Sequence, residues 1–350
     1  MNEKEKTKMF KDVFNPKKGE KIIILIDSPH DKIKDNEKWK DRRKMAKAWY
    51  KTFTNMGEKT GFKTEILIYP ATGVHNSQIP KETIKTIKKT DLIIAMTEYS
   101  ASSSLVPITQ EKNSKIRCAS MPTVERRMEK TAFKADYKKV QKYATAIEEI
   151  LNKSNTAEII FSTNDTLKMD LRNRKAYAGG GNCQNKGNFI NFPSGEACQA
   201  PYEATTDEKK EFGESKTKGI LPVNYNEEIV KYQIENNKII KIIGEGVKAE
   251  EMRAFFNEKE SRRNIAELGI GCNPNAVVTG NVLEDEKVAG LHIAYGMSTH
   301  LGGKIKSDMH MDICYPKNAP IEATKLTLIG KNGEKINLIL DSQLQYNLLK

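Results

Sequence analysis

The feature that most constrains the fold is the spacing of apolar runs in the first 150 residues. Four strand-sized runs cover residues 21–27, 64–69, 91–96 and, more weakly, 115–120. Residues 35–56, 81–89 and 136–152, between and after these runs, have helical composition. Strands that alternate with helices form parallel sheets covered by helices. We therefore expect residues 1–155 to form a doubly wound α/β domain with an open parallel sheet.

The pattern changes near Ala157, where paired strands joined by short polar turns replace the alternation. The expected hairpins are residues 158–162 with 167–171 and residues 229–234 with 238–243. One helix near 248–256 precedes further strands at 289–295, 310–314, 325–328 and 335–340. A chain of 350 residues is long enough for two cores. Residues 156–350 are thus expected to form a β-rich α+β domain that carries the catalytic metal site.

Several classes of location are excluded by composition. No apolar run approaches the roughly 20 residues that span a bilayer. The first 11 residues are rich in lysine and glutamate and do not read as a secretory signal. The five cysteines are an odd number without CxxC spacing, which disfavours a disulfide framework and a cysteine zinc site. We expect a cytoplasmic protein with free thiols and no membrane partner.

The net charge of +12 belongs to the first part of the chain. Residues 1–150 carry 32 Lys and Arg against 20 Asp and Glu, which leaves 26 against 26 for residues 151–350. The excess is spread along helical segments without the aromatic and glycine pattern of a single-strand-binding surface. We expect these lysines to form a solvated face of the protein, and weak affinity for polyanions is the alternative. No nucleic-acid partner is predicted.

Three of the five histidines, His292, His300 and His310, lie within nineteen residues of one another. His310 and Asp312 are two residues apart, and on a strand this spacing aims both side chains at one face. An imidazole and a carboxylate are ligands expected of zinc, manganese, cobalt or ferrous iron. Taken alone, the pair could equally be two polar residues that face solvent.

Three more residues extend this candidate metal site. His292 sits inside an apolar run, where a core histidine bonded to a backbone carbonyl is the alternative. Glu267 interrupts another apolar stretch and needs a cation or a basic partner, for which Arg262 or Arg263 would serve. Glu196 lies in a loop punctuated by proline and glycine, where an exposed glutamate would be ordinary.

Taken in order, four motifs resemble the thermophilic metalloaminopeptidase family, which includes aminopeptidases T and S and leucyl aminopeptidase-like proteins. The motifs are Asn-x-Pro-x-Gly-Glu at 191–196, Ala-Glu-Leu-Gly at 266–269, Leu-x-Asp-Glu-Lys with His-Ile-Ala-x-Gly at 283–296, and His-x-Asp at 310–312. The resemblance spans about residues 115–316. It implies a hydrolase, a metalloprotease that removes N-terminal residues from peptides or cleaves a related small amide, and we expect a homodimer.

The same resemblance implies a ligand set and a catalytic role. Two divalent ions, zinc, cobalt or manganese, would be bound by Glu196, Glu267, His292, His310 and Asp312. Five ligands rich in carboxylate suit two cations that share a nucleophilic water. Glu196 or Glu267 would then act as the catalytic proton shuttle.

One position departs from the family, which places a tyrosine where this chain has Thr299, followed by His300. His300 could substitute as a ligand, or could lie in a surface turn. The alternative function is a ring-cleaving dioxygenase of the dihydroxypyridine type, which uses one ferrous ion held by two histidines and a carboxylate. Such relatives carry histidine at the position of Glu267, so the glutamate favours the hydrolase. A binding or structural module is the third reading.

Overall fold

The computed structural model describes residues 1–226 and 228–350. By compactness the chain divides into two units, each built from several segments. Unit 1 comprises residues 1–141, 179–194 and 275–284, and unit 2 comprises residues 142–178, 195–274 and 285–350. Compactness does not measure independent folding, so the division near residue 155 stays a prediction about domains.

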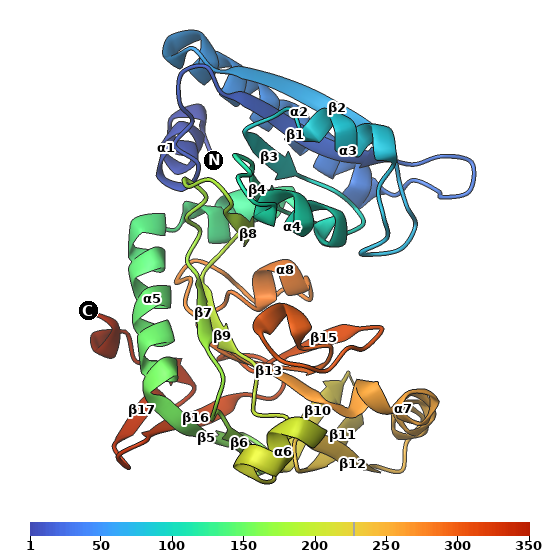
Figure 1. Cartoon of the computed structure of the whole chain (residues 1–350), viewed down its shortest axis with the longest axis vertical. Coiled ribbons are helices and arrows are strands. Elements are labelled where there is room, and N and C mark those ends of the chain that lie inside the picture. Colours follow the sequence, from blue (N-terminus) through green and yellow to red (C-terminus); the bar gives the residue numbers. More distant parts are fainter. Residues whose placement is uncertain (227) are drawn as a thin grey trace. The chain divides into compact units, whose positions relative to one another are not determined.

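Unit 1 contains a five-stranded sheet in the order β2-β1-β3-β4-β8 (Figure 1). All four pairs of neighbouring strands are parallel. The expected open parallel sheet is therefore present. Its strands are β1 (Lys21–Ser28), β2 (Lys63–Pro70), β3 (Leu92–Ala95), β4 (Arg117–Ser120) and β8 (Phe189–Asn191). Its helices are α1 (Glu3–Val13), α2 (Glu37–Thr60), α3 (Lys81–Ile87), α4 (Ser102–Gln110) and α8 (Val282–Asp285), of which α8 extends one residue into unit 2.

Strand β1 shows why helices cover both faces of this sheet. Ile22, Ile24 and Ile26 pack in one cluster with residues of α1 and α2, whereas Ile23 and Leu25 pack in another with residues of α3 and α4. Successive side chains of a strand point to opposite faces, so a continuous apolar run is buried on both sides. The arrangement is the doubly wound one that the alternation predicts.

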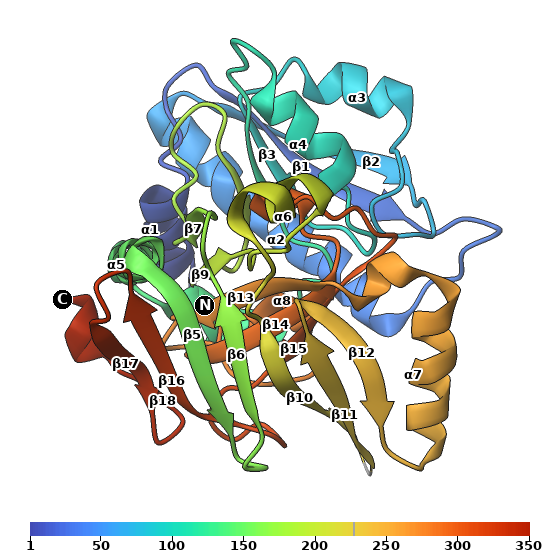
Figure 2. The same ribbon diagram turned by 60° about the horizontal axis from the view of Figure 1, so that its bottom comes forward.

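Unit 2 contains two sheets. The larger has eight strands in the order β12-β11-β10-β6-β5-β16-β17-β18, and all its neighbouring strands are antiparallel (Figure 2). The smaller has the order β15-β14-β13-β9-β7. The strands of the larger sheet are β5 (Ser154–Phe161), β6 (Thr166–Asp170), β10 (Lys218–Tyr225), β11 (Glu228–Glu235), β12 (Lys238–Ile243), β16 (Ala323–Gly330), β17 (Lys335–Leu340) and β18 (Gln343–Leu344). The strands of the smaller sheet are β7 (Ala176–Gly179), β9 (Glu196–Gln199), β13 (Ile265–Gly271), β14 (Gly290–Gly296) and β15 (His310–Cys314).

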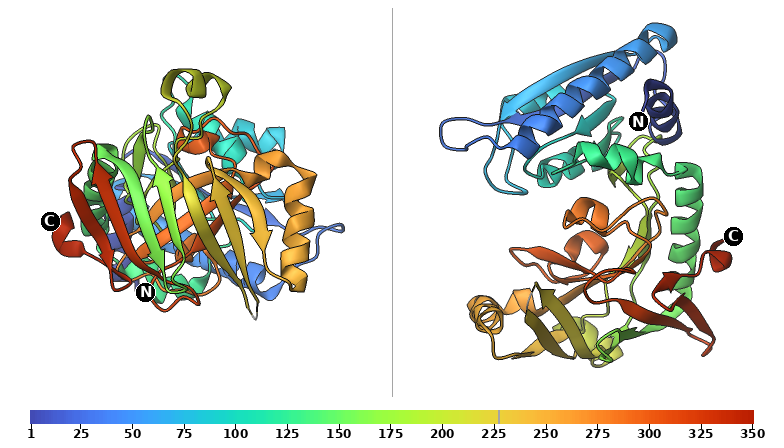
Figure 3. Two further views of the ribbon diagram at one scale, coloured as in Figure 1. Left: turned by 90° about the horizontal axis from the view of Figure 1, so that it is seen from below. Right: turned by 180° about the vertical axis from the view of Figure 1, so that it is seen from behind.

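The remaining helices are α5 (Tyr137–Lys153), α6 (Thr206–Phe212) and α7 (Val247–Glu258), and short 3₁₀ turns include η4 (Thr299–Leu301). Figure 3 shows α7 beside β12 at one edge of the eight-stranded sheet. Ala249 and Phe256 of α7 belong to the core of unit 2. Among the described residues, no helix is both long and apolar enough to cross a membrane.

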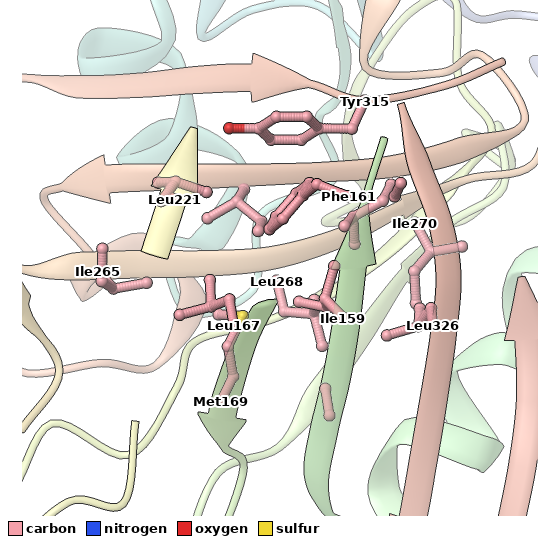
Figure 4. Packing of buried hydrophobic residues seen from close by; sticks show 14 of the residues in the cluster. Ile159, Phe161, Leu167, Met169, Leu221, Ile265, Leu268, Ile270, Tyr315 and Leu326 are labelled. Atoms are coloured by element: carbon pink, nitrogen blue, oxygen red, sulfur yellow. The ribbon is translucent and has the colours of Figure 1, made fainter. Parts of the chain in front are cut away.

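One apolar core joins the two sheets of unit 2. Ile159 and Phe161 of β5 and Leu167 and Met169 of β6 meet Leu268 and Ile270 of β13, as Figure 4 shows. Each pair of names is two residues apart, which is the period of a strand. The smaller sheet therefore turns one face toward the larger sheet, and the residues between, such as Glu267, point to its other face.

Most of these elements agree with the sequence predictions, but two strands that matter for the site, β9 and β13, do not. The expected hairpins correspond to β5–β6 and β11–β12, and the strand at 310–314 coincides with β15. The sequence predicts a loop where β9 lies, because proline and glycine surround Glu196, and only an apolar stretch where β13 lies. Pairing with distant strands supplies the extended conformation there, and this is not visible in local composition.

Candidate metal centre

All five expected ligands lie on one face of the five-stranded sheet of unit 2. Ala197, Leu268, Ile270, Leu291 and Ile293 point into the core of unit 2. Because strands alternate, the neighbouring positions point to the opposite face. These are Glu196 on β9, Glu267 on β13, His292 on β14, and His310 and Asp312 on β15. The expectation that His310 and Asp312 share a strand face is confirmed.

Small residues on the same face make room for these side chains. Gly269 is paired with His292, and a Cβ built on Gly269 would lie 1.9 Å from Nε2 of that imidazole. Real Cβ atoms do not approach another heavy atom so closely. Gly269 therefore creates the space in which the ring of His292 lies.

Glu267 is the centre of the cluster. Its Oε1 lies 3.3 Å from Nε2 of His292 and its Oε2 lies 3.0 Å from Nε2 of His310. The Glu267 side chain is only 7% exposed. A carboxylate this buried requires positive or hydrogen-bonding partners, and two imidazoles provide them. The alternative partners Arg262 and Arg263 make ion pairs with other acidic residues.

His310 is oriented by two further contacts. Its Nδ1 lies 2.7 Å from the carbonyl oxygen of Met297, so the proton of the neutral ring sits on Nδ1. This leaves the lone pair of Nε2 directed at Glu267 and at Asp312, whose Oδ1 lies 3.4 Å away. A histidine that ligates a metal ordinarily donates its other N–H in this way. The geometry thus fits His310 as a ligand through Nε2.

A buried lysine that the sequence analysis did not single out as a site residue completes the charge arrangement. Nζ of Lys287 lies 2.5 Å from Oε1 of Glu196 and 2.6 Å from Oε1 of Glu286. Lys287 is fully buried. The signal for it was its place beside two acidic residues in an apolar context, but its partner Glu196 is 91 residues away in sequence. Glu196 keeps its other oxygen, Oε2, 3.5 Å from Nε2 of His292.

The carboxylates of the cluster raise the pKa values of both histidines. Burial lowers the pKa of His292, but Glu267, Glu196 and Asp312 outweigh that effect and raise it to about 9. Burial likewise opposes the charged form of His310, yet Asp312 and Glu267 hold its pKa well above the ordinary value. The carboxylates that favour a positive charge on these rings are equally able to attract a metal cation.

Among the described residues, two sets of donor atoms are compact enough to hold an ion, and Glu267 belongs to both. One set is Glu196, Glu267 and His292, and the other is Glu267, His300 and His310. Within each set the ligand atoms all lie within 4.8 Å of one another. Carboxylates combined with imidazoles suit a divalent transition metal and disfavour calcium. These residues fit a metal centre, whereas the number of ions and the role of each residue stay proposals.

His300, expected either to replace a ligand or to lie in a turn, lies in a turn, and its replacement of a ligand stays a proposal. It is the middle residue of the turn η4, and its ring stands 4.6 Å from that of His310 at 81°. Thr299 precedes it on the same turn.

A pocket of unit 2 lies away from this cluster. This pocket has a volume of about 660 Å³ on the opposite, outer face of the eight-stranded sheet, and Lys168, Lys218 and Lys325 are among its lining residues. It has neither a histidine nor a group of metal-type donors. The chemistry of the donor cluster, rather than cavity size, identifies the candidate site.

Comparison with known proteins shows the family of this chain. The sequence model of the 2,5-dihydroxypyridine 5,6-dioxygenase family matches residues 17–320. No sequence among the curated proteins matches the chain. In fold, the chain is similar to a 2,5-dihydroxypyridine dioxygenase from Pseudomonas putida KT2440, with a TM-score of 0.70, 16% identity, and coverage of 99% of this chain and 98% of that one. It is also similar to wild-type AmpT from Thermus thermophilus, with a TM-score of 0.61, 13% identity and 98% coverage of both chains.

The expected membership of the metalloaminopeptidases is therefore wrong, and so are the hydrolase and metalloprotease functions that it implied. The motifs that suggested it place ligands on a fold, and one fold supports more than one chemistry. The inference from Glu267 to a hydrolase is therefore also wrong. The same holds for a proton shuttle for peptide hydrolysis at Glu196 or Glu267. The family match covers most of the chain, and the protein belongs to the 2,5-dihydroxypyridine 5,6-dioxygenase family.

Proposed function

We propose that this protein is a ferrous-iron dioxygenase that opens the ring of a dihydroxylated pyridine. The observation that carries the proposal is the grouping of Glu267 with two imidazoles in a chain that belongs to this family. Two histidines and one carboxylate are the ligand composition of non-heme iron oxygenases. The reaction would break one carbon–carbon bond of the ring and the O–O bond, and each of the two carbons of the broken ring bond would receive one oxygen atom.

A ferrous ion would supply the one-electron chemistry through which dioxygen can react with an aromatic ring. The protein's own residues would position that ion and balance its charge. The carbonyl of Met297 holds the ring of His310 with Nε2 toward Glu267. The ammonium group of Lys287 compensates the negative charges of Glu196 and Glu286. These two carboxylates therefore already have a positive partner within the protein. This pairing favours one bound ion over the two expected from the number of carboxylates alone.

The test uses metal-free protein loaded with ferrous iron under argon. Addition of oxygen and 2,5-dihydroxypyridine should consume one oxygen molecule per substrate molecule as the absorbance of the aromatic ring disappears. Zinc-loaded protein should be inactive, because zinc has no redox chemistry. Unblocked short peptides should release no amino acid.

Four variants make this test specific to the site. Glu267→Gln and His310→Ala should abolish oxygen uptake and iron retention. The matched controls Glu260→Gln and His75→Ala change an exposed glutamate and a histidine outside the cluster, and both should retain activity. Iron at full occupancy and normal uptake in Glu267→Gln and His310→Ala would contradict the proposed site, whereas a failure of all iron-loaded forms would contradict the function.

Three expectations from the sequence accompany this proposal. We propose a small-molecule substrate, no nucleic-acid partner and a homodimer. Cytoplasmic location also stays a prediction. Sedimentation at micromolar concentration measures the assembly directly, and a monomer would contradict the dimer.

A further inference from the structure

We propose that Glu267, His300 and His310 are the three side chains that ligate the metal ion, with His300 supplying the second imidazole. The assignment of the ion as iron depends on the proposed function, but ligation by these three side chains does not. His300 thereby takes the ligand role that the sequence left open for it, although it lies outside every strand of the sheet.

The first support is the composition and spacing of the donors. The ligand atoms of Glu267, His300 and His310 lie within 4.8 Å of one another. Donors about 2.1 Å from one ion are separated by no more than about twice that length, so only small adjustments are needed. This set has two imidazoles and one carboxylate, which is the composition of a facial triad.

The competing set, Glu196, Glu267 and His292, is less suitable. It has one imidazole and two carboxylates, and Oε1 of Glu196 is held by the buried Lys287. The side chain of His292 is 2% exposed, which leaves little access for additional ligands. A catalytic ion must keep positions open for substrate and oxygen. His300 itself is exposed and therefore borders the accessible side of the cluster.

The loop that carries His300 is closed at its base by backbone hydrogen bonds. It connects β14 to β15, and the N–H of Met297 donates to the carbonyl of Met309 at 2.8 Å. The N–H of Ser298 donates to Ile305 at 3.1 Å, and that of Gly303 donates back to Ser298 at 3.1 Å. The same Met297 whose carbonyl accepts from His310 thus begins this loop. The two imidazoles are oriented by one piece of backbone.

A buried carboxylate fixes the loop to the rest of unit 2. Glu203 accepts hydrogen bonds from the Ser298 hydroxyl and, at 2.6 Å, from the N–H of Lys304. Its other partners are Nδ2 of Asn264 at 3.1 Å and the guanidinium of Arg174 at 3.0 Å. A fully enclosed carboxylate with four partners is costly to rearrange. Glu203 therefore acts as a positioning residue for the turn that carries His300.

The decisive measurement is binding of Co²⁺ to metal-free protein, followed by its visible absorption and by X-ray absorption spectroscopy. The wild type should show two imidazole ligands. His300→Ala should show one and should bind Co²⁺ at least about tenfold more weakly, since even partners outside the ligand shell cost 10- to 100-fold. His310→Ala should behave similarly.

Thr299→Ala is the matched control because it changes the neighbouring side chain on the same turn. It should retain wild-type affinity and two imidazoles. Glu203→Gln should weaken Co²⁺ binding by less than His300→Ala while the metal keeps the same ligands. An unchanged affinity and spectrum in His300→Ala would overturn the proposal, as would a loss of one imidazole in His292→Ala but not in His300→Ala. Because none of these readouts uses activity, a failure of the proposed function would leave them unaffected.

Discussion

Lys287 and Glu196 form a buried ion pair in which Nζ and Oε1 are 2.5 Å apart, and the lysine side chain is 1% exposed. Lys287 also pairs with Glu286. Removing one partner of a buried pair leaves charge that is neither solvated nor compensated. The consequences for stability can be measured without any metal.

Lys287→Met should lower the free energy of unfolding of the metal-free protein by about 3–5 kcal/mol, the usual effect of breaking a buried pair. Urea unfolding measures this change. Lys248→Met is the control, because Lys248 pairs with Glu251 on an exposed helix surface and should produce a much smaller effect. If both substitutions lowered the free energy of unfolding by the same amount, the ion pair of Lys287 would contribute no more than an exposed pair, which would contradict the prediction.

Gly269→Ala should distort the candidate metal site, because Gly269 on β13 lies directly opposite His292 on β14. The added Cβ would meet the imidazole of His292, so either the ring or strand β13 must move. Overpacking of this kind costs about 1–3 kcal/mol, and we expect weaker Co²⁺ binding as well. Gly330→Ala is the comparison, since its Cβ would first meet the end of the Asn332 side chain, which can rotate away. Thermal melts and metal titrations of both variants check the difference.

The acid side of the stability curve should depend on Glu208. Burial raises the pKa of Glu208, but Arg174 and the N–H and hydroxyl of Thr205 lower it further, to about 2. A carboxyl whose folded pKa is lowered contributes stability above its unfolded pKa, and this contribution is lost as the pH falls through the folded pKa. The window therefore runs from about 4.5 down to about 2. Glu208→Gln should be less stable than the wild type at pH 7 and should lose less further stability across this window. Parallel curves for the two proteins would contradict the assignment.

The basic excess of residues 1–150 should not produce specific nucleic-acid binding. Fluorescence anisotropy with duplex and single-stranded DNA at physiological salt should give dissociation constants no tighter than the non-specific range of about 10⁻⁴ to 10⁻⁶ M. Tight, sequence-selective binding would require a localised surface that the dispersed lysines do not predict.

The sequence could predict those parts of the site that follow from strand periodicity. His310 and Asp312 share a face because they are two residues apart on one strand, and the doubly wound sheet follows from apolar runs alternating with helices. Lys287 could not be paired with Glu196 in advance, because their contact depends on how distant segments fold together. The contact of His310 with the carbonyl of Met297 likewise depends on the path of a loop.

The reaction was harder to predict than the ligands. Motifs around Glu196, Glu267, His292 and His310 specify a face of a sheet with metal donors, and this arrangement is compatible with hydrolysis or with oxygen chemistry. The exchange of a tyrosine for Thr299 and the presence of His300 pointed away from the peptidase, but one sequence gave no measure of how much that departure mattered.

The most direct test of the account is mass spectrometry of the product formed by iron-loaded protein from 2,5-dihydroxypyridine under ¹⁸O₂. A ring-cleaving dioxygenase inserts both atoms of one oxygen molecule, so the ring-opened product should carry two labelled oxygens, and none when the experiment uses ¹⁶O₂ in labelled water under conditions without exchange. A product that carries only oxygen from water, or an intact ring after prolonged incubation with ferrous iron and oxygen, would contradict the proposed dioxygenase.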